Sequence, residues 1–265
     1  MNILKKSIAP ITDEAWKEIT EQAEKIFKIH LTARQFVDID GPNGLEMGAI
    51  STGRLHFPDD KSKTGVNYGI REVIPLIEVR KPFKIELMEL DNIDRGSKDA
   101  DLGGLENAAI EIAMFEEQLI YKGFKDLVKG LEESSEHAPV SLPDEPEKIL
   151  KTLGDQVHSL QKEGVGGPFT LIVNEEKWKS LTSMARGYPL LKQLQQIING
   201  KIIVNYTTEN SILVTEREGD YELVLGQDMS IGYDDHDTRE VKLYFTESFT
   251  FRVYSPEAIR VFKNA

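Results

Sequence analysis

The chain has 265 residues, of which 40% are hydrophobic, and it carries a formal net charge of −13. It contains no cysteine, which excludes disulfides, thiolate metal sites and cysteine nucleophiles, and its acidic balance argues against a nonspecific nucleic-acid-binding protein. It shows neither an apolar run of about 18 residues nor the apolar region of a signal peptide after Met1, so we predict a cytoplasmic protein without a membrane span.

The first predicted helix begins near Thr12, whose side chain can cap it, while Asp13 and Glu14 favour its positive end. Apolar residues at helical spacing continue one face of this helix to about Arg34. A short strand over residues 36–40 follows and ends at a Gly-Pro-Asn-Gly turn.

Residues 45–83 form a long stretch without helical period, and residues 58–65 in its middle read as a polar turn. The pattern predicts a β-arm of two extended segments with an exposed tip. Such an arm has little to bury within its own subunit, which suggests that it lies on a neighbouring subunit. The alternative is an ordinary hairpin that packs on the core of its own subunit. The residues alone leave both interpretations open.

A second amphipathic helix is predicted by apolar residues that step by three and four: Leu105, Ala108, Ile112, Phe115 and Leu119. A linker rich in Glu, Ser and Pro, over about residues 131–146, separates this part from an insert of helices and strands. Helices of the insert are predicted to end near Gly164, to begin after Asn174 and to begin at Pro189. Its short strands are predicted over 169–173, 202–205, 212–216 and 221–225.

The last predicted strand begins at Val241, and apolar residues occupy most of its odd positions up to Val253. Glu247 interrupts this apolar face, so it marks either a bulge or a paired, buried carboxylate. The strand needs partners and must return to the first part of the chain. The sequence therefore predicts an α+β fold with a discontinuous first domain and a compact inserted one.

Residues 225–233, Leu-Gly-Gln-Asp-Met-Ser-Ile-Gly-Tyr, follow a strand-like stretch and contain two glycines. The glycines predict a tight turn or the close approach of another group. Met229 and Ile231 alternate with Asp228 and Ser230, which gives a lining suited to something short and apolar with polar ends. We interpret this segment as a surface for assembly or for peptide docking.

The sequence lacks the patterns of catalytic and metal sites. Its five histidines form no HExxH motif or i,i+4 pair, and no G-x-S-x-G occurs. Residues 164–168 are glycine-rich but lack the lysine of a phosphate-binding loop. The acidic residues at 234–237 fit a solvated turn better than an ion site. We therefore expect neither an enzyme nor a metal site.

Several stretches together resemble the family 1 encapsulins, the linocin M18-like shell proteins of nanocompartments, which have the fold of HK97-type phage major capsid proteins. The matches run in order along nearly the whole chain: LKKSIAP at 4–10, FVDIDGP at 36–42, YGIR at 68–71, IPLIEVR at 74–80, ELDNIDRG at 89–96, residues 225–233, and FTESFTF at 245–251. The resemblance implies an α+β, HK97-like fold with a peripheral domain, an axial domain and an extended β-arm (E-loop).

The resemblance also implies where the domains begin and end. The N-terminal helix and the start of the peripheral domain would occupy 1–46, the extended loop 47–68, and the peripheral domain with its spine helix 69–145. The axial domain would occupy 146–226, and 227–265 would return to the peripheral domain. The arm would then lie over adjacent subunits, and the axial domains would meet at fivefold axes.

By this resemblance the protein is not an enzyme but assembles with itself into an icosahedral shell of the smallest (T=1) size. The shell would enclose cargo enzymes, commonly ferritin-like iron oxidases or dye-decolourising peroxidases, that dock by a C-terminal targeting peptide. Its roles would then be iron storage and protection from oxidative stress, with neither nucleic acid nor a membrane as a partner. The alternatives are a prophage major capsid protein and a secreted, bacteriocin- or protease-like protein.

The resemblance places the peptide site on the N-terminal helix and on residues 225–233. Four side chains would form its apolar pocket: Phe27, Leu31, Met229 and Ile231. Polar contacts would come from Arg34 and Asp38, with Asp228 at the rim. Plain core packing is the alternative for Phe27 and Ile231.

The resemblance further implies a pore and bears on a cofactor. The fivefold pore would be lined by Ser183, Met184, Ala185, Arg186 and Gly187. Some members bind a flavin against a tryptophan in the strand before the Glu-Leu-Asp-Asn motif. This chain has Met88 at that place, which removes the stacking surface, so no cofactor is expected.

Overall fold

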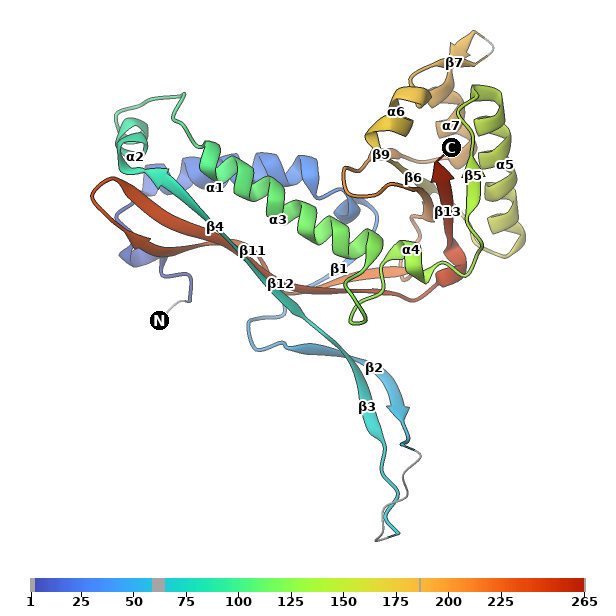
Figure 1. Cartoon of the computed structure of the whole chain (residues 1–265), viewed down its shortest axis with the longest axis horizontal. Helices are drawn as coiled ribbons and strands as arrows, with labels where there is room; N and C mark the ends of the chain where they lie inside the picture. The colour runs from blue at the N-terminus through green and yellow to red at the C-terminus, as the bar shows by residue number, and fades with distance from the viewer. Residues whose placement is uncertain (1–2, 59–64, 186, 265) are drawn as a thin grey trace.

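The computed structural model describes residues 3–58, 65–185 and 187–264. It shows a four-stranded sheet with two long helices, a second domain at one end of that sheet, and a two-stranded arm that projects from the body (Figure 1). Among the described residues, the helices are too short or too polar to cross a membrane.

The four-stranded sheet has the order β1-β11-β12-β4. β1 runs parallel to β11, whereas the other neighbours are antiparallel. Phe245, Phe249 and Phe251 of β12 are buried, as the alternation of apolar residues predicts. The strands are β1 (Asp38–Asp40), β4 (Ile77–Glu86), β11 (Tyr221–His236) and β12 (Glu240–Val253).

Helix α1 (Asp13–His30) begins as predicted, because the Thr12 hydroxyl accepts a hydrogen bond from the Ala15 N–H at 3.2 Å. It ends at His30 rather than near Arg34. The chain then forms a short 3₁₀ turn, η2 (Ala33–Gln35), before it enters β1. This early end places Arg34 on a turn beside the sheet and not on the helix.

Helix α3 (Gly103–Lys122) packs with α1 on one face of the sheet (Figure 1). The predicted stripe is confirmed, since Leu105, Ala108, Ile112 and Leu119 are buried. Phe27 of α1 meets Phe245 of β12 edge-on, with 5.3 Å between the ring centres. The short helices of this part are η1 (Lys6–Ile8) and α2 (Leu87–Asp94).

The second domain contains a five-stranded sheet with the order β5-β13-β10-β6-β9. Its strands are β5 (Val140–Leu142), β6 (Phe169–Val173), β9 (Ile202–Val204), β10 (Ser211–Thr215) and β13 (Ile259–Asn264). Its helices are α5 (Pro146–Lys162), α6 (Glu175–Leu181) and α7 (Leu190–Ile198). The Asn174 side chain caps α6 by accepting from the Lys177 N–H at 2.8 Å, as predicted.

The structure divides the chain differently from the predicted boundaries at 146 and 227. The predicted linker contains α4 (Leu131–Ser134) and β5, and β5 pairs with the C-terminal strand β13 in the second sheet. β11, in contrast, already begins at Tyr221 in the first sheet. The C-terminal strand joins the second sheet because its apolar residues, such as Ile259 and Phe262, are buried there.

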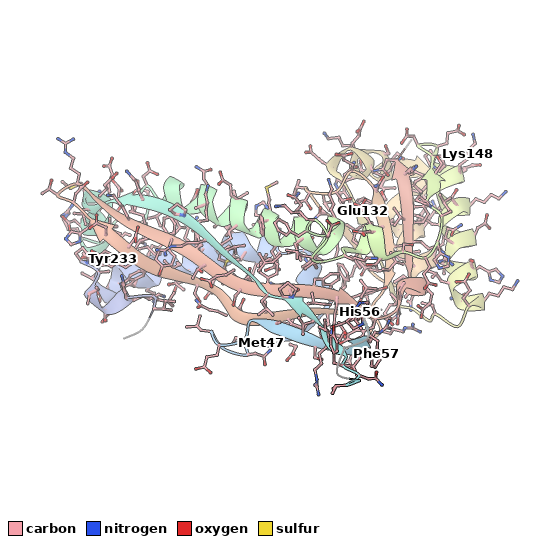
Figure 2. All side chains as sticks on the ribbon, turned by 60° about the horizontal axis from the view of Figure 1, so that its bottom comes forward. Met47, His56, Phe57, Glu132, Lys148 and Tyr233 are labelled. Atoms are coloured by element: carbon pink, nitrogen blue, oxygen red, sulfur yellow. The ribbon has the colours of Figure 1, made fainter. Side chains whose placement is uncertain are left out.

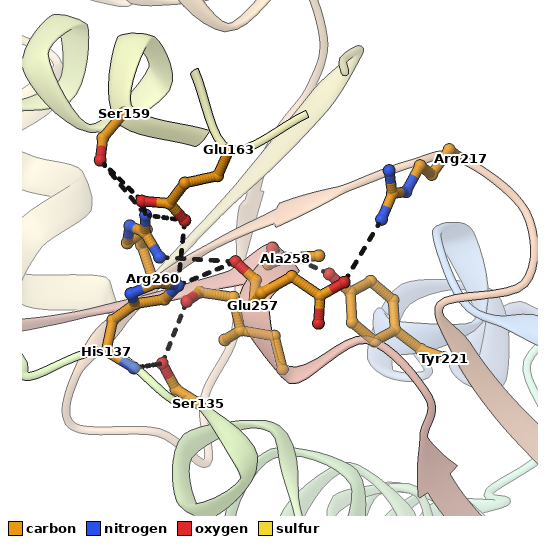
Figure 3. Close-up of polar contacts among 10 residues, drawn as sticks. Ser135, His137, Ser159, Glu163, Arg217, Tyr221, Glu257, Ala258 and Arg260 are labelled. Carbon is orange, nitrogen blue, oxygen red and sulfur yellow. Dashed lines mark hydrogen bonds and ion pairs between the residues drawn. The ribbon is translucent and has the colours of Figure 1, made fainter. Parts of the chain in front are cut away.

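Polar contacts fix this crossing from the first sheet to the second (Figure 3). Arg260 of β13 is buried and donates to both carboxylate oxygens of Glu163 at 3.0 Å. The Ser135 hydroxyl donates to the Ile259 carbonyl oxygen at 3.0 Å. Ser135 and Glu163 come before the short helix η3 (Pro256–Ala258) in the chain, whereas Arg260 follows it. The residues predicted as a linker therefore belong to the framework of the second domain.

The arm consists of β2 (Ala49–His56) and β3 (Ile70–Pro75), which pair only with each other. The side chains of His56 and Phe57 lie on it (Figure 2). Ile50, the second residue of β2, is buried, but most other large apolar residues on the described part of the arm are exposed: Leu55, Phe57, Val66, Tyr68, Ile70 and Val73. Beyond Ile50, the described arm therefore lacks a core of its own, as expected for an element that lies on a neighbouring subunit.

Candidate functional site

A groove of about 470 Å³ lies between the C-terminal half of α1, the turn that follows it and β11. Five of the seven residues predicted for the peptide site line it: Phe27, Leu31, Arg34, Asp228 and Met229. Glu24, Lys28 and Gln35 complete its lining. The groove therefore combines an apolar floor with a charged rim, although its residues come from segments about 200 positions apart in the chain.

Ile231 and Asp38 do not line the groove. Ile231 is 5% exposed and belongs to the core under α1, so core packing is the correct interpretation for it. The Asp38 carboxylate on β1 accepts from the Gly219 N–H at 2.6 Å. Asp38 thus ties β1 to the loop before β11 and makes no contribution to the groove wall.

Arg34 is held by three carboxylates. Its guanidinium donates to both oxygens of Glu116, at 2.9 and 2.6 Å, to Glu247 at 2.6 Å and to Asp228 at 2.9 Å. Glu116 comes from α3, Glu247 from β12 and Asp228 from β11. One side chain therefore joins three elements at the base of the groove.

The two glutamates of this cluster are fully buried, whereas the Asp228 side chain is 46% exposed. Burial, followed by repulsion from Glu116, holds the pKa of Glu247 well above its ordinary value, and Arg34 acts in the opposite direction. Burial opposes the charge of Arg34, but its hydrogen bond and attraction to Glu116 raise its pKa. Of the two interpretations of Glu247, a bulge or a paired and buried carboxylate, the structure therefore shows the buried pair, with Arg34 as the partner.

A second glutamate of α3, Glu117, holds the same turn from its other side. Its carboxylate accepts from the Thr32 hydroxyl, from the Ala33 N–H at 2.9 Å and from the Asn205 side-chain amide at 2.7 Å. Burial raises the pKa of Glu117 to about 8, an effect that the hydrogen bonds from Thr32 and Ala33 oppose. Asn205 follows β9, so this network connects the groove turn with the second domain.

The glycines of residues 225–233 permit close approach and do not form a turn, since β11 continues through them. A Cβ on Gly226 would lie 2.5 Å from the Ser248 hydroxyl, and one on Gly232 would lie 2.2 Å from the Tyr244 ring. The strand shifts register against β12 on both sides of Gln227. These irregularities aim Asp228 and Met229 toward the groove.

Of the residues predicted for the pore, Met184 and Ala185 form one strand of a hairpin at the tip of the second domain (Figure 1). Its strands are β7 (Met184–Ala185) and β8 (Tyr188–Pro189). Met184 is exposed, Ala185 is buried, and Gly187 has a φ of 75° that favours glycine. The predicted pore residue Arg186 lies outside the described residues.

Comparison with known proteins decides between the candidate families. A family model described as encapsulating protein for peroxidase (Linocin_M18) matches residues 1–250. The type 1 encapsulin shell protein of Rhodococcus erythropolis is 36% identical over 261 residues, which cover 98% of each protein. The chain belongs to the type 1 encapsulin shell proteins.

Solved structures show the same fold. A virus-like particle from Pyrococcus furiosus superimposes with a TM-score of 0.62 at 20% identity, over 91% of this chain and 98% of that one. The capsid of an empty GTA particle gives a TM-score of 0.55 at 14% identity, over 89% of this chain and 90% of that one. The predicted α+β, HK97-like capsid fold is confirmed.

As a member of the type 1 encapsulin shell proteins, the chain is a shell subunit rather than an enzyme. This membership favours the shell over the prophage capsid and the secreted bacteriocin or protease. Within the described residues, no three His, Asp or Glu side chains are grouped to hold a metal. The acidic residues Asp234 and Asp235 are exposed near the end of β11.

Met88 lies on α2 and not on the strand before it. It is 59% exposed, and its sulfur is 3.5 Å from an Arg95 nitrogen. An exposed methionine on a helix offers no aromatic plane for a flavin ring. The expectation of a cofactor-free encapsulin stays a prediction.

Proposed function

We propose that this encapsulin recruits a cargo protein through an extended C-terminal peptide that docks in the groove between α1 and β11. The observation that carries the proposal is the convergence of Phe27, Leu31 and Met229 on one partly open, apolar hollow. Isolated apolar residues on a surface are common, whereas a groove with a charged rim suits a peptide with aliphatic anchors.

The charges of the groove favour a basic residue in that peptide. The only arginine in the groove lining is already bonded to three carboxylates, so it is not available to an acidic ligand. Asp228 remains half exposed, and Glu24 also lines the groove. Arg34 therefore positions Asp228, and Asp228 is the group that would meet a lysine or arginine of the cargo.

An extended peptide loses conformational freedom on binding, so a single groove should bind it only modestly. A closed shell presents many identical grooves, and a cargo with several tails can occupy several of them at once. Efficient loading then depends on the number of sites rather than on the strength of one.

The test is a single substitution in the groove. Met229→Asp places a carboxylate on the apolar floor, where lost solvation costs roughly 1–3 kcal/mol or more. Met229→Leu is the matched control, because it keeps the floor apolar. Shells of both variants should assemble, but only the Asp variant should emerge empty when cargo is co-expressed, as measured by the cargo-to-shell ratio of purified particles. Wild-type loading of Met229→Asp would place the docking site elsewhere.

The identity of the cargo and the size of the shell belong to the same proposal. A peroxidase cargo is supported by the description of the matching family, and a ferritin-like iron oxidase rests on the sequence resemblance. We also propose the smallest (T=1) shell, in the cytoplasm, with the hairpin that contains Met184 lining the fivefold pore. Mass spectrometry of proteins that co-purify with native shells would identify the cargo.

A further inference from the structure

The outer edge of β11 is open over part of its length. β1 covers this edge from Glu222 to Val224, and the N–H groups of Asn43 and Gly44 continue the cover by donating to the carbonyl oxygens of Leu225 and Gly226 at 2.9 and 2.7 Å. Further along, the Leu4 carbonyl oxygen accepts from the Tyr233 N–H at 2.8 Å. Between Gln227 and Gly232, no described segment other than β12 forms a backbone hydrogen bond to β11. An edge of this kind can pair with an extended chain.

A second hollow, of about 350 Å³, lies beside this edge. Ile3 and Leu45, which contribute to its walls, are 52% and 57% exposed. Asp228 lines both this hollow and the groove, so the two adjoin at that residue. The second hollow is therefore continuous with the proposed docking site and is also mainly apolar.

The side chains of β11 connect the two hollows in the way a strand requires. Successive residues of a strand point to opposite faces of the sheet. Met229 lines the groove, and Ser230 lines the second hollow. A strand added beside them would send its own alternate side chains into the same two hollows.

Gln227 provides an independent sign of a missing partner. It lines the second hollow, and its side-chain nitrogen is buried without an acceptor among the described residues. Buried amide donors in folded proteins nearly always have an acceptor. A backbone carbonyl of an extended peptide in the hollow would supply one.

We propose that the targeting peptide binds as an added β-strand on the outer edge of β11, over residues Gln227 to Gly232. Its alternate side chains fill the groove and the second hollow, and a peptide carbonyl accepts from Gln227. This inference rests on the proposed function and adds the conformation in which the peptide binds and the hollows that its side chains fill. The peptide then needs aliphatic residues on both of its faces and not only on the face toward α1.

The experiment uses assembled shells and a fluorescent protein fused to the C-terminal tail of the protein that co-purifies with the wild-type shell. Leu45→Asp places a charge in the second hollow, and Leu127→Asp is the matched control, because Leu127 is a similarly exposed leucine (52%) outside both hollows. Leu45→Asp should reduce the fluorescent protein per shell by about tenfold, while the control loads normally. Hydrogen exchange of residues 226–233 should be slower in loaded than in empty wild-type shells.

The outcomes separate this inference from the proposed function. If Leu45→Asp loads normally while Met229→Asp is empty, the groove alone binds the peptide and the inference is wrong. If Met229→Asp also loads normally, the proposed function itself is wrong. If Leu45→Asp fails to assemble while Leu127→Asp assembles, a second copy of the chain covers the hollow and the peptide does not. Unchanged hydrogen exchange on loading would overturn strand addition.

Discussion

Arg34 is the only cation in a cluster with two buried glutamates and one half-exposed aspartate. Replacing a buried ion pair by apolar residues can be neutral, but removing one partner leaves the others buried without compensation. The arginine also fixes the turn after α1, on which the shape of the groove depends. The same contacts of Arg34 with the three acidic side chains therefore stabilise the fold and set the shape of the groove.

We expect Arg34→Met to lower the free energy of unfolding by about 3–5 kcal/mol, because Glu116 and Glu247 lose their counterion. Arg34→Lys should lose less, since lysine keeps the charge but lacks the planar fork that reaches several carboxylates. Arg95→Met, at an exposed arginine, should change stability by about 0.5 kcal/mol or less. Urea denaturation followed by tryptophan fluorescence measures all three. Equal stability of Arg34→Met and Arg95→Met would contradict the account of the cluster.

Glu117 predicts a pH dependence of stability. Burial raises its pKa to about 8 from an ordinary value of 4.5, so the folded state binds a proton that the unfolded state has lost. This stabilisation is complete below about pH 4.5 and disappears as the pH rises through about 8. The thermal midpoint of the wild type should therefore fall between pH 5 and pH 9.

Glu117→Gln, which mimics the protonated side chain, should reduce this fall. Glu176→Gln, at an exposed glutamate of α6, is the control and should leave the pH profile as in the wild type. Thermal unfolding at several pH values gives the comparison. A Glu117→Gln profile as steep as that of the wild type would show that this carboxyl is ionised in the folded protein at all pH values tested.

At the scale of elements, sequence periodicity predicted most helices and strands, because amphipathic faces and capping residues are local signals. The stripe of α3, the cap at Asn174 and the alternation in β12 are all confirmed. The early end of α1 was not predictable, because it depends on Glu117 binding the turn from a distant helix. The membership of β13 in the second sheet likewise depends on a partner, β5, hidden in a stretch that resembles a linker.

The distinction between local sequence signals and contacts of distant segments also applies to the groove. Five of its residues came from the family resemblance, and their convergence is a property of the fold. Glu116 was missed, although a glutamate between buried positions of an amphipathic helix, such as Ile112 and Leu119, is a detectable signal. Its partner Arg34 is far away in the sequence, so the sequence alone could not pair them. For Ile231 the sequence left core packing open as the alternative, and the structure places this residue in the core under α1.

The arm is the element whose removal should have the largest effect on assembly. Its exposed apolar residues, such as Leu55, Phe57 and Tyr68, have no core within the described chain, and a neighbouring subunit would cover them. Deleting residues 47–68 should therefore abolish shells, as seen in negative-stain images. Deleting only 59–64, which lie outside the described residues, should be mild because their sequence is a polar turn. Intact shells after the larger deletion would show that the arm is no clamp between subunits.

At the scale of the whole molecule, three features fit a subunit made to contact copies of itself. The arm projects from the body, the pore hairpin lies at the tip of the second domain, and the groove opens beside α1 (Figure 1). Contacts that relate different surfaces of identical subunits either close into a particle or continue without limit. The capsid fold and the family membership indicate closure.

Cryo-electron microscopy of the chain expressed alone and purified at neutral pH tests the central claim most directly. We predict closed icosahedral shells of the smallest size, in which each arm lies on a neighbouring subunit and each groove opens to the interior. The grooves must face inward because cargo can be enclosed only from that side. Particles that remain monomers or dimers, or shells whose grooves face the solvent outside, would contradict the account.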